Sequence, residues 1–203
     1  TELDLAAPAD HLSGSHRRPV MFIQTESTPN PATLKFLPGR PVMAAGTADF
    51  PDVEAARRSP LAERLFQVDG VTGVFLGGDF VTVAKRDDKE WHLLKPALLG
   101  VGMEHFMAGR PVLPTETPDN PAAASGADDE LSRQIRDLIE TRVRPAVAQD
   151  GGDIIFRRFE DGVVFLHLQG SCAGCPSSTA TLKMGIENML RHYVPEVLEV
   201  RAV

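Results

Sequence analysis

The chain has 203 residues, of which 42% are hydrophobic and 24% charged, a composition typical of one large or two small globular domains. The formal net charge of −7 and the pI near 5.4 argue against a nucleic-acid-binding protein, which would carry a basic stripe. No apolar run approaches the roughly 20 residues that cross a bilayer, so we expect neither a nucleic acid nor a membrane as a partner.

Residues 1–20 lack the apolar core of a signal peptide and are expected to be a disordered extension outside the fold. Their acidic residues Glu2, Asp4 and Asp10 argue against an organellar transit peptide. The two cysteines of the chain are too few for a secreted disulfide framework, so we expect reduced thiols. These features together predict a cytoplasmic protein.

Residues 21–107 have the pattern of a first small domain, with strands and helices in the order ββαββα. Its strands are rich in β-branched and aromatic residues, and the Gly-Gly-Asp sequence at 77–79 predicts a tight hairpin between the last two. The expected strands are Met21–Glu26, Thr33–Leu37, Val71–Leu76 and Phe80–Val83.

Two helices are expected in this domain. The first begins at Ser59 and Pro60, because proline is tolerated in the first turn of a helix. The second is expected to run through Leu99, with Asp87 and Glu90 as a pair that caps its N-terminus.

Residues 108–127 contain four prolines among threonine, serine and acidic residues, a composition that cannot bury a core. We expect a flexible linker here, with its ends roughly 20–25 Å apart if it is a coil. It separates the first domain from a second one at residues 128–203.

The second domain is expected in the order αββα, with a short final strand, which makes the chain an α+β protein of two small domains. Pro145 is expected to end or kink its first helix. Asp150 and Asp153 flank two glycines and are expected to be turn residues. The expected strands are Ile154–Phe159, Val163–Leu168 and Val197–Val200.

Cys172 and Cys175 form a Cys-x-x-Cys motif between a strand and the N-terminus of a helix that begins near Pro176. Free N–H groups and the helix dipole lower the pKa of nearby thiols and favour the thiolate. No Asp, Glu, Lys or Arg occurs from Gly162 to Leu182, which spares an anionic cluster from repulsion. These features suit a redox disulfide, a zinc site and an iron–sulfur site alike.

The number of ligands narrows these alternatives. A [4Fe–4S] cluster takes four thiolates and a closed zinc site takes four ligands, but the chain has two cysteines. A two-fold symmetric dimer would supply four, with only two bonds from each chain. A client protein that offers three or four thiolates could displace so weakly held a cluster, and this favours a carrier.

Two rival interpretations remain open. A thiol–disulfide oxidoreductase also places its motif between a strand and a helix, but within a βαβ unit, whereas here a hairpin precedes the motif. A structural zinc dimer would have to recruit His167 or His192. We expect His167 to be a packed or hydrogen-bonded strand residue and His192 to interact with the dipole at a helix C-terminus.

Two segments carry a resemblance to a known family. Gln149-Asp-Gly-Gly-Asp-Ile154, the hairpin after it and Gly170-Ser-Cys-Ala-Gly-Cys-Pro176 resemble the C-terminal domain of NifU, which the Nfu proteins share. The opening MFIQTESTPNPATLKFLPG at 21–39 resembles the N-terminal domain of bacterial and mitochondrial Nfu proteins. The resemblance covers all but the linker and residues 1–20.

The resemblance implies an iron–sulfur cluster carrier, not an enzyme. It implies that Cys172 and Cys175 of two chains hold a [4Fe–4S] cluster between them, so that the loaded protein is a homodimer. An upstream assembly scaffold would donate the cluster, and apo iron–sulfur proteins such as aconitase or lipoyl synthase would receive it. The first domain has no cysteine and is expected to dock these clients.

Overall fold

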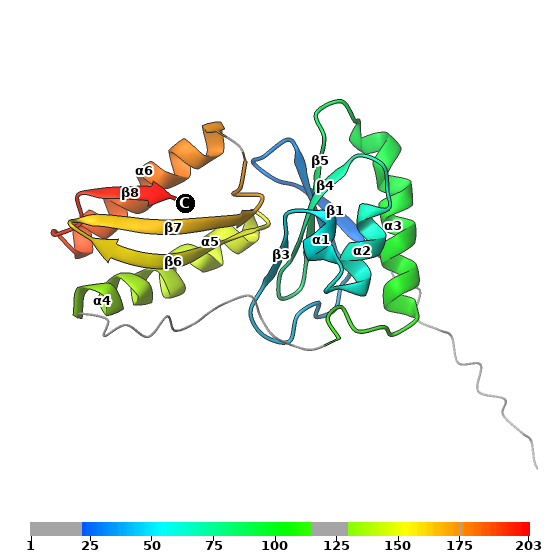
Figure 1. Ribbon diagram of the computed structural model, residues 1–203, viewed down its shortest axis with the longest axis horizontal. Coiled ribbons are helices and arrows are strands. Elements are labelled where there is room, and N and C mark those ends of the chain that lie inside the picture. Colours follow the sequence, from blue (N-terminus) through cyan, green and yellow to red (C-terminus); the bar gives the residue numbers. More distant parts are fainter. Residues whose placement is uncertain (1–21, 115–129, 175) are drawn as a thin grey trace, which may run out of the picture.

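Buried apolar side chains gather in two separate clusters, one in each half of the chain. The computed structural model describes residues 22–114, 130–174 and 176–203. The predicted extension at 1–20 and most of the predicted linker lie outside these residues. The described residues form two α+β domains, as predicted, and Figure 1 shows them side by side.

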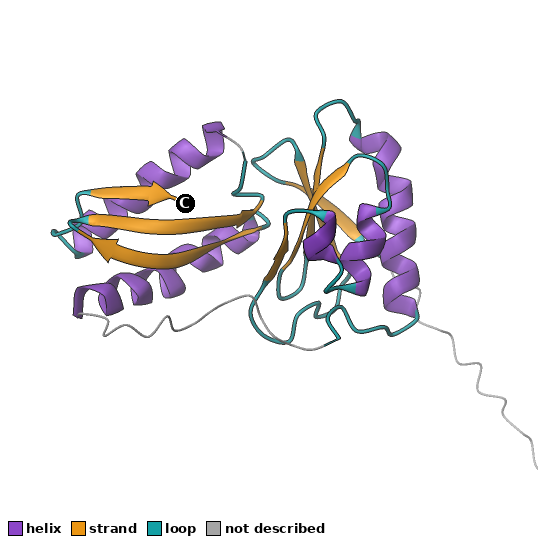
Figure 2. Cartoon of the chain, viewed as in Figure 1, coloured by secondary structure: helices purple, strands orange, loops and turns teal. Residues whose placement is uncertain are grey.

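The first domain is a five-stranded antiparallel sheet with helices on one face (Figure 2). Its strands, in the spatial order β1-β2-β5-β4-β3, are β1 (Gln24–Ser27), β2 (Thr33–Leu37), β3 (Ala48–Phe50), β4 (Val71–Leu76) and β5 (Val81–Lys85). Its helices are α1 (Val53–Ala56), α2 (Pro60–Phe66) and α3 (Trp91–Met107). The predicted ββαββα order holds, except that β3 and α1 were missed because three or four residues are too short to show a period.

Strand register divides the sheet into two faces. Val81 of β5 pairs with Leu76 of β4, and both belong to the core beneath the helices. One residue along, Thr82 pairs with Phe75 on one side and with Lys35 of β2 on the other. Because successive strand residues point to opposite faces, these three side chains lie on the face away from the helices. That face meets the second domain (Figure 2).

The N-termini of α2 and α3 can be compared with the two predicted helix starts. The Oγ of Ser59 accepts a hydrogen bond from the N–H of Ala62 at 3.1 Å, and Pro60 occupies the first turn of α2, as predicted. The predicted cap of α3 is wrong: Glu90 is itself the N-cap and makes no side-chain cap bond, so Asp87 lies outside the helix. Apolar residues continue to bury beyond the predicted end of α3, which therefore reaches Met107.

The second domain is a three-stranded sheet with the order β6-β7-β8. A turn with positive φ at Asp161 and Gly162 joins β6 to the antiparallel β7, whereas β8 pairs with β7 in parallel. The strands are β6 (Gly152–Glu160), β7 (Val163–Gly170) and β8 (Glu199–Ala202). The helices are α4 (Glu130–Leu138), α5 (Arg144–Gln149) and α6 (Pro176–Tyr193). β8 lies two residues beyond its predicted position.

A π-helical segment, Ile139–Val143, joins α4 to α5 directly before Pro145. Proline has no N–H to donate to the carbonyl one turn earlier, so the regular ladder is interrupted there. Thr141 Oγ1, in this segment, donates a hydrogen bond to the carbonyl of Asp137 in α4 at 2.6 Å. The predicted kink at Pro145 is therefore a change of helix type.

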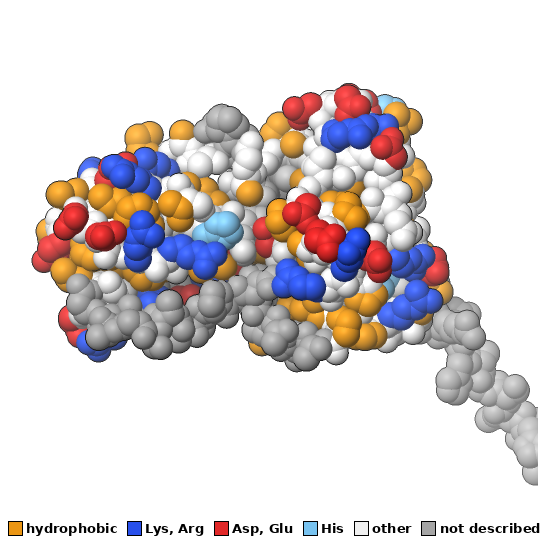
Figure 3. Space-filling view, in the orientation of Figure 1, with side chains coloured by type: hydrophobic (Ala, Val, Ile, Leu, Met, Phe, Trp, Pro, Cys, Tyr) orange, Lys and Arg blue, Asp and Glu red, His pale blue; other side chains and the backbone are white. Residues whose placement is uncertain are grey.

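Basic and acidic side chains are interspersed over both domains on the face shown in Figure 3. Ion pairs join many of them, for example Arg64 with Glu104 and Arg86 with Asp88. In the described part of the chain, no helix has both the length and the apolar character that crossing a membrane requires.

Candidate metal centre

The cysteine motif lies where β7 ends, on the side of the second domain that faces the first (Figure 1). Cys172 follows the strand in a short loop, and α6 begins four residues later. Cys175, the other predicted ligand, lies outside the described residues. Cys172 is buried, with 7% of its surface exposed, and belongs to the apolar cluster of its domain.

The turn before β6 forms hydrogen bonds with this loop. The N–H of Ser171 donates to the carbonyl of Gly151 at 3.2 Å, and Ser171 Oγ donates to the carbonyl of Asp150 at 2.6 Å. A Cβ on Gly152 would lie 2.5 Å from Cys172 Sγ, which is closer than atoms can approach. The glycine therefore leaves the space that the sulfur occupies.

The surroundings of Cys172 hold its thiol protonated. Burial raises the pKa of Cys172 to about 11, and the carboxylates of Asp150 and Asp153 raise the pKa further while the Ser171 hydroxyl lowers it. The prediction of a lowered pKa is therefore wrong for Cys172. The sequence around the motif has no charged residue, but folding brings toward it the carboxylate of Asp150 from the preceding turn and that of Asp153 from the start of β6. A soft metal ion or cluster would have to displace this proton, and it needs a path to the sulfur.

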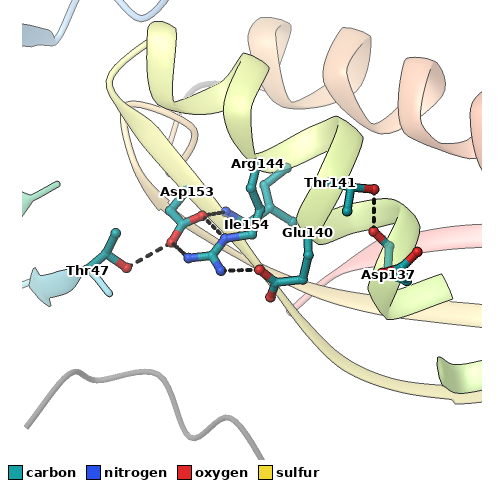
Figure 4. A network of polar contacts seen from close by, with 7 residues as sticks. All are labelled: Thr47, Asp137, Glu140, Thr141, Arg144, Asp153 and Ile154. Atoms are coloured by element: carbon teal, nitrogen blue, oxygen red, sulfur yellow. Dashed lines mark hydrogen bonds and ion pairs between the residues drawn. The ribbon is translucent and has the colours of Figure 1, made fainter. Parts of the chain in front are cut away.

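Asp153 is not the turn residue that the sequence indicated. It lies in β6 with 3% of its surface exposed and makes a two-point ion pair with Arg144, whose Nε and Nη2 lie 2.7 and 2.6 Å from its oxygens (Figure 4). Glu140 accepts from Arg144 Nη1 at 2.6 Å on the other side. Hydrogen bonding to Asp153 is the largest cause that raises the pKa of Arg144. This network ties the π-helical segment to the start of β6.

Thr47 of the first domain completes the network (Figure 4). Its Oγ1 donates to Asp153 Oδ2 at 2.8 Å. The aspartate that orders the turn beneath the cysteine loop is therefore also a contact between the domains. Nothing in the sequence pattern indicates this contact, since the two residues are 106 positions apart.

Asn30 of the first domain contacts the cysteine loop itself. Its Nδ2 donates to the carbonyl oxygens of Ser171 and Ala173, each at 3.2 Å. These two carbonyls lie on either side of Cys172. A single amide group therefore holds the main chain before and after the candidate ligand.

Two strand residues contact the turn beneath the loop. Thr82 Oγ1 donates to the carbonyl of Gly151 at 2.6 Å, and Lys35 Nζ donates to the carbonyl of Gln149 at 3.0 Å. Both side chains come from the sheet face away from the helices. We refer to the first-domain residues that meet the loop and turn, namely Asn30, Lys35, Thr47, Phe75 and Thr82, as the docking face.

The remaining candidate ligands lie apart from Cys172. His167 Nδ1 is 2.7 Å from the main-chain oxygen of Val203, as expected of a hydrogen-bonded strand residue. His192 lies in the last turn of α6, where its ring meets Tyr193 edge to face. Among the described residues, no group of three or more His, Cys, Asp or Glu side chains could hold a metal ion. Further ligands for a metal on Cys172 must therefore come from outside this set.

The parallel strand β8 removes one argument against the disulfide alternative. β7, α6 and β8 form a βαβ unit with the motif at its first junction. From the sequence, we counted the hairpin before the motif against a disulfide site, which usually lies in a βαβ unit. The structure has both the hairpin and a βαβ unit. The arrangement of strands therefore does not separate a cluster site from a redox site.

Comparison with known proteins covers both domains. The family model described as the scaffold protein Nfu/NifU N-terminal domain matches residues 23–109, and the model of the NifU-like domain matches residues 135–201. The chain is 53% identical over 184 residues to "NFU1 iron-sulfur cluster scaffold homolog, mitochondrial" of Homo sapiens, which covers 90% of this chain and 72% of that protein. It is 51% identical over 201 residues to "NifU-like protein 4, mitochondrial" of Arabidopsis thaliana, covering 95% and 69% respectively.

A solved structure is also similar. The solution structure of a NifU-like protein from Saccharomyces cerevisiae matches 55% of this chain with a TM-score of 0.45 and 24% identity. The chain spans 64–72% of the length of the curated relatives from human, fruit fly and Arabidopsis thaliana.

These relatives contradict one prediction. They are named as mitochondrial proteins, so the prediction of a cytoplasmic protein is wrong on this comparison. That prediction depended on the acidic residues at 1–20, which argued against a transit peptide, and on the small number of cysteines, which indicates only that thiols are kept reduced and does not distinguish one reducing compartment from another.

Proposed function

The chain belongs to the Nfu family of iron–sulfur cluster scaffold proteins, and from this premise we propose that it carries an iron–sulfur cluster and delivers it to other proteins. The cargo is a [4Fe–4S] cluster held by Cys172 and Cys175 of one chain and the same pair of a second copy. The protein receives the cluster from an assembly scaffold and passes it to apo-proteins. It catalyses no covalent turnover of its own.

The observation that carries this proposal is the position of Cys172. Its sulfur lies at the end of a strand, in a space that Gly152 leaves free, and no His or carboxylate ligand set surrounds it in the described residues. The whole chain contains two cysteines, and a cluster needs four thiolates. A second copy supplies the missing pair most simply, because a two-fold axis repeats the same loop.

Two thiolates from each chain hold the cluster weakly enough for it to be delivered. Each chain supplies half of the thiolates, so a client that offers three or four of its own can replace them one at a time. The chain's residues contribute by keeping other ligands away: Cys172 packs in an apolar cluster, and Asp153, one of the two carboxylates that act on it, is paired with Arg144. The first domain has no cysteine and serves to hold the client.

A thiol–disulfide oxidoreductase remains the second candidate, because the motif opens the helix of a βαβ unit. In that case, Cys172 and Cys175 would alternate between dithiol and disulfide, and a mutant lacking the resolving cysteine would trap mixed disulfides with partner proteins. A zinc dimer bridged by the four cysteines is the third.

The test compares metal content, absorption spectrum and mass of the anaerobically purified protein. We expect a brown protein with about four irons per dimer, and a loss of stable cluster binding in Cys172→Ser and Cys175→Ser. Ala173→Ser is the matched control: it places a serine in the same loop at an exposed position and leaves both thiols in place. The control should bind iron as the wild type does.

Three results would contradict the proposal. Iron at wild-type stoichiometry in both cysteine variants would exclude these ligands. One zinc per colourless dimer would identify the structural alternative. A metal-free protein that forms mixed disulfides would identify the oxidoreductase.

A further inference from the structure

The docking face buries polar side chains that its position would otherwise leave in water. Helices cover one face of the first domain's sheet, and the opposite face of such a sheet is commonly solvated. Yet Asn30, Lys35 and Thr82 are 4%, 7% and 2% exposed. A buried polar group is costly unless it is hydrogen-bonded, and a buried ammonium more so. The second domain supplies acceptors to all three, and Glu26 of the first domain also pairs with the Lys35 ammonium at 3.6 Å.

The bonds all have the same direction. In the described residues, five hydrogen bonds run from side chains of the first domain to oxygens of the second. Four of the acceptors are main-chain carbonyls, and all lie in the cysteine loop or in the turn that supports it. The docking face is therefore a set of donors arranged around the cysteine loop, rather than a general contact between two domains.

The interface is polar and incompletely packed. A cavity of about 180 Å³ lies between the sheet and the loop, lined by Phe75 and Thr82 on one side and by Gly170, Ala173 and Gly174 on the other. Domain interiors pack with few voids larger than a water molecule. Water can replace the carbonyl acceptors when the domains part, so separation loses little. The contact has the character of an interface that opens.

Contact between the two domains is incompatible with a cluster shared by two chains. Cys172 is nearly inaccessible, and Asn30 holds the carbonyls on both sides of it. A cluster bonded to the same cysteines of two chains brings the second cysteine loop against the first, where the docking face now lies. This step rests on the proposed function, because only a shared cluster requires that approach.

We infer that the docking face is an intramolecular cap: it binds the chain's own cysteine loop in the apo-protein and must release the loop before a second copy can share a cluster. The occupant of this face is therefore the second domain itself. A second copy competes with it for the same loop. Because each loaded dimer requires two open chains, the closed form lowers the apparent affinity of loading by the open fraction of both partners.

The test weakens the docking face without touching either cysteine. Asn30→Asp keeps Oδ1, which accepts from the N–H of Ala32 at 3.0 Å, but turns the donor toward Ser171 and Ala173 into a second oxygen that repels their carbonyls. Thr82→Val removes the hydroxyl donor and keeps the shape. The double variant removes three hydrogen bonds between the domains and should shift the closed-to-open ratio by roughly tenfold or more.

The matched control is Gln24→Glu with Thr25→Val. These changes also replace an amide by a carboxylate and a threonine by valine, but on β1, at the edge of the sheet away from the loop. Lys35→Met, which removes one donor without a new charge, is a second variant that should shift the ratio in the same direction by a smaller factor. It keeps the inference testable if the double variant does not fold.

Two measurements are made on each full-length protein. Small-angle X-ray scattering of the apo-protein reports whether the domains part, and anaerobic reconstitution across a dilution series reports the protein concentration at which half of the chains hold cluster. The double variant should show a larger radius of gyration and, because the open fractions of both partners multiply, half-loading at a protein concentration lower by up to roughly a hundredfold. The control should match the wild type in both.

The outcomes separate this inference from the proposed function. Unchanged scattering in the folded double variant and in Lys35→Met would show that these donors do not hold the domains together. Open domains with an unchanged half-loading concentration would show that closure does not oppose loading, while cluster binding itself would stand. Failure of every protein to bind a cluster would overturn the proposed function, and the cap with it.

Discussion

The two faces of the first domain's sheet are both buried, but by different physical means. Leu76 and Val81 lie on the face that packs against the helices, and their burial removes apolar surface from water. Lys35 and Thr82, on the other face, are buried by hydrogen bonds to the second domain. Apolar burial is lost whenever the helices leave, whereas water can take over the hydrogen bonds. One face therefore holds the fold, and the other holds a contact that can separate.

The largest effect is expected where the second domain anchors this contact. Asp153→Asn should lower the free energy of unfolding by about 3–5 kcal/mol, because it leaves the guanidinium of Arg144 half-buried without its main partner. Glu140→Gln makes the same change on the other side of Arg144, where the carboxylate side chain is 47% exposed, and should cost under about 1 kcal/mol. Urea unfolding measures both. Equal losses would show that burial does not set the strength of these pairs.

The next largest effect compares the two faces of the first domain's sheet by one substitution on each. Leu76→Ala removes a fully buried side chain from the helix-covered face and should cost about 3 kcal/mol. Thr82→Ala, on the neighbouring strand and the opposite face, should cost about 1 kcal/mol and act by opening the domains. Denaturant unfolding combined with scattering distinguishes the two. If Thr82→Ala proved as costly as Leu76→Ala, the docking face would be part of the core.

Two glycines of the cysteine loop provide a finer comparison. Gly170 and Gly174 both have positive φ, so alanine should cost about 1 kcal/mol of backbone strain at either position. At Gly170 the new Cβ would also lie 2.7 Å from the carbonyl oxygen of Gly151, which accepts from Thr82, and 2.9 Å from Phe75 of the docking face, whereas at Gly174 it would meet nothing within 4 Å. Gly170→Ala should therefore enlarge the apo-protein in scattering, and Gly174→Ala should not. If the two variants gave the same scattering, Phe75 would not be part of the contact between the domains.

The smallest effect concerns a buried histidine on the helix side. Burial, followed by the charges of Arg110 and Arg64, lowers the pKa of His105, and neither ring nitrogen has a partner among the described residues. As the pH falls below about 6.5, the unfolded chain takes up this proton before the folded one, so stability should fall as the pH is lowered through this range. Unfolding curves at several pH values measure it. His105→Leu should flatten that slope, and an unchanged slope would assign it to another group.

Local signals predicted much of the fold. Ser59 with Pro60 marked a helix start, and the Gly-Gly-Asp sequence at 77–79 marked the hairpin between β4 and β5, because each is determined by neighbours along the chain. β3 was too short to show a period. Asp87 was misjudged because the capping pattern fits several starting positions, and packing of α3 selects one.

The candidate site was predicted less completely, because its environment is assembled from distant segments. The spacing of the cysteines marked the motif, but the raised pKa of Cys172 depends on burial and on Asp150 and Asp153, which lie in and just after an earlier turn. Lys35 and Thr82 alternate with apolar residues as solvent-facing strand residues do. Only the second domain makes them buried, and no period in the sequence indicates that.

The direction of the hydrogen bonds between the domains has an evolutionary consequence. Gln149, Gly151, Ser171 and Ala173 each present only a main-chain carbonyl to the first domain, and every residue type carries that group. Apart from Asp153, whose carboxylate accepts from Thr47, and the glycines whose positive φ or close contacts fix the turn, the second domain can therefore exchange side chains along this contact as long as its turn and loop keep their path. The first domain cannot, because its half of the contact consists of particular donors. Sequence drift between related proteins should be constrained by side-chain chemistry on one side of the interface and by backbone shape on the other.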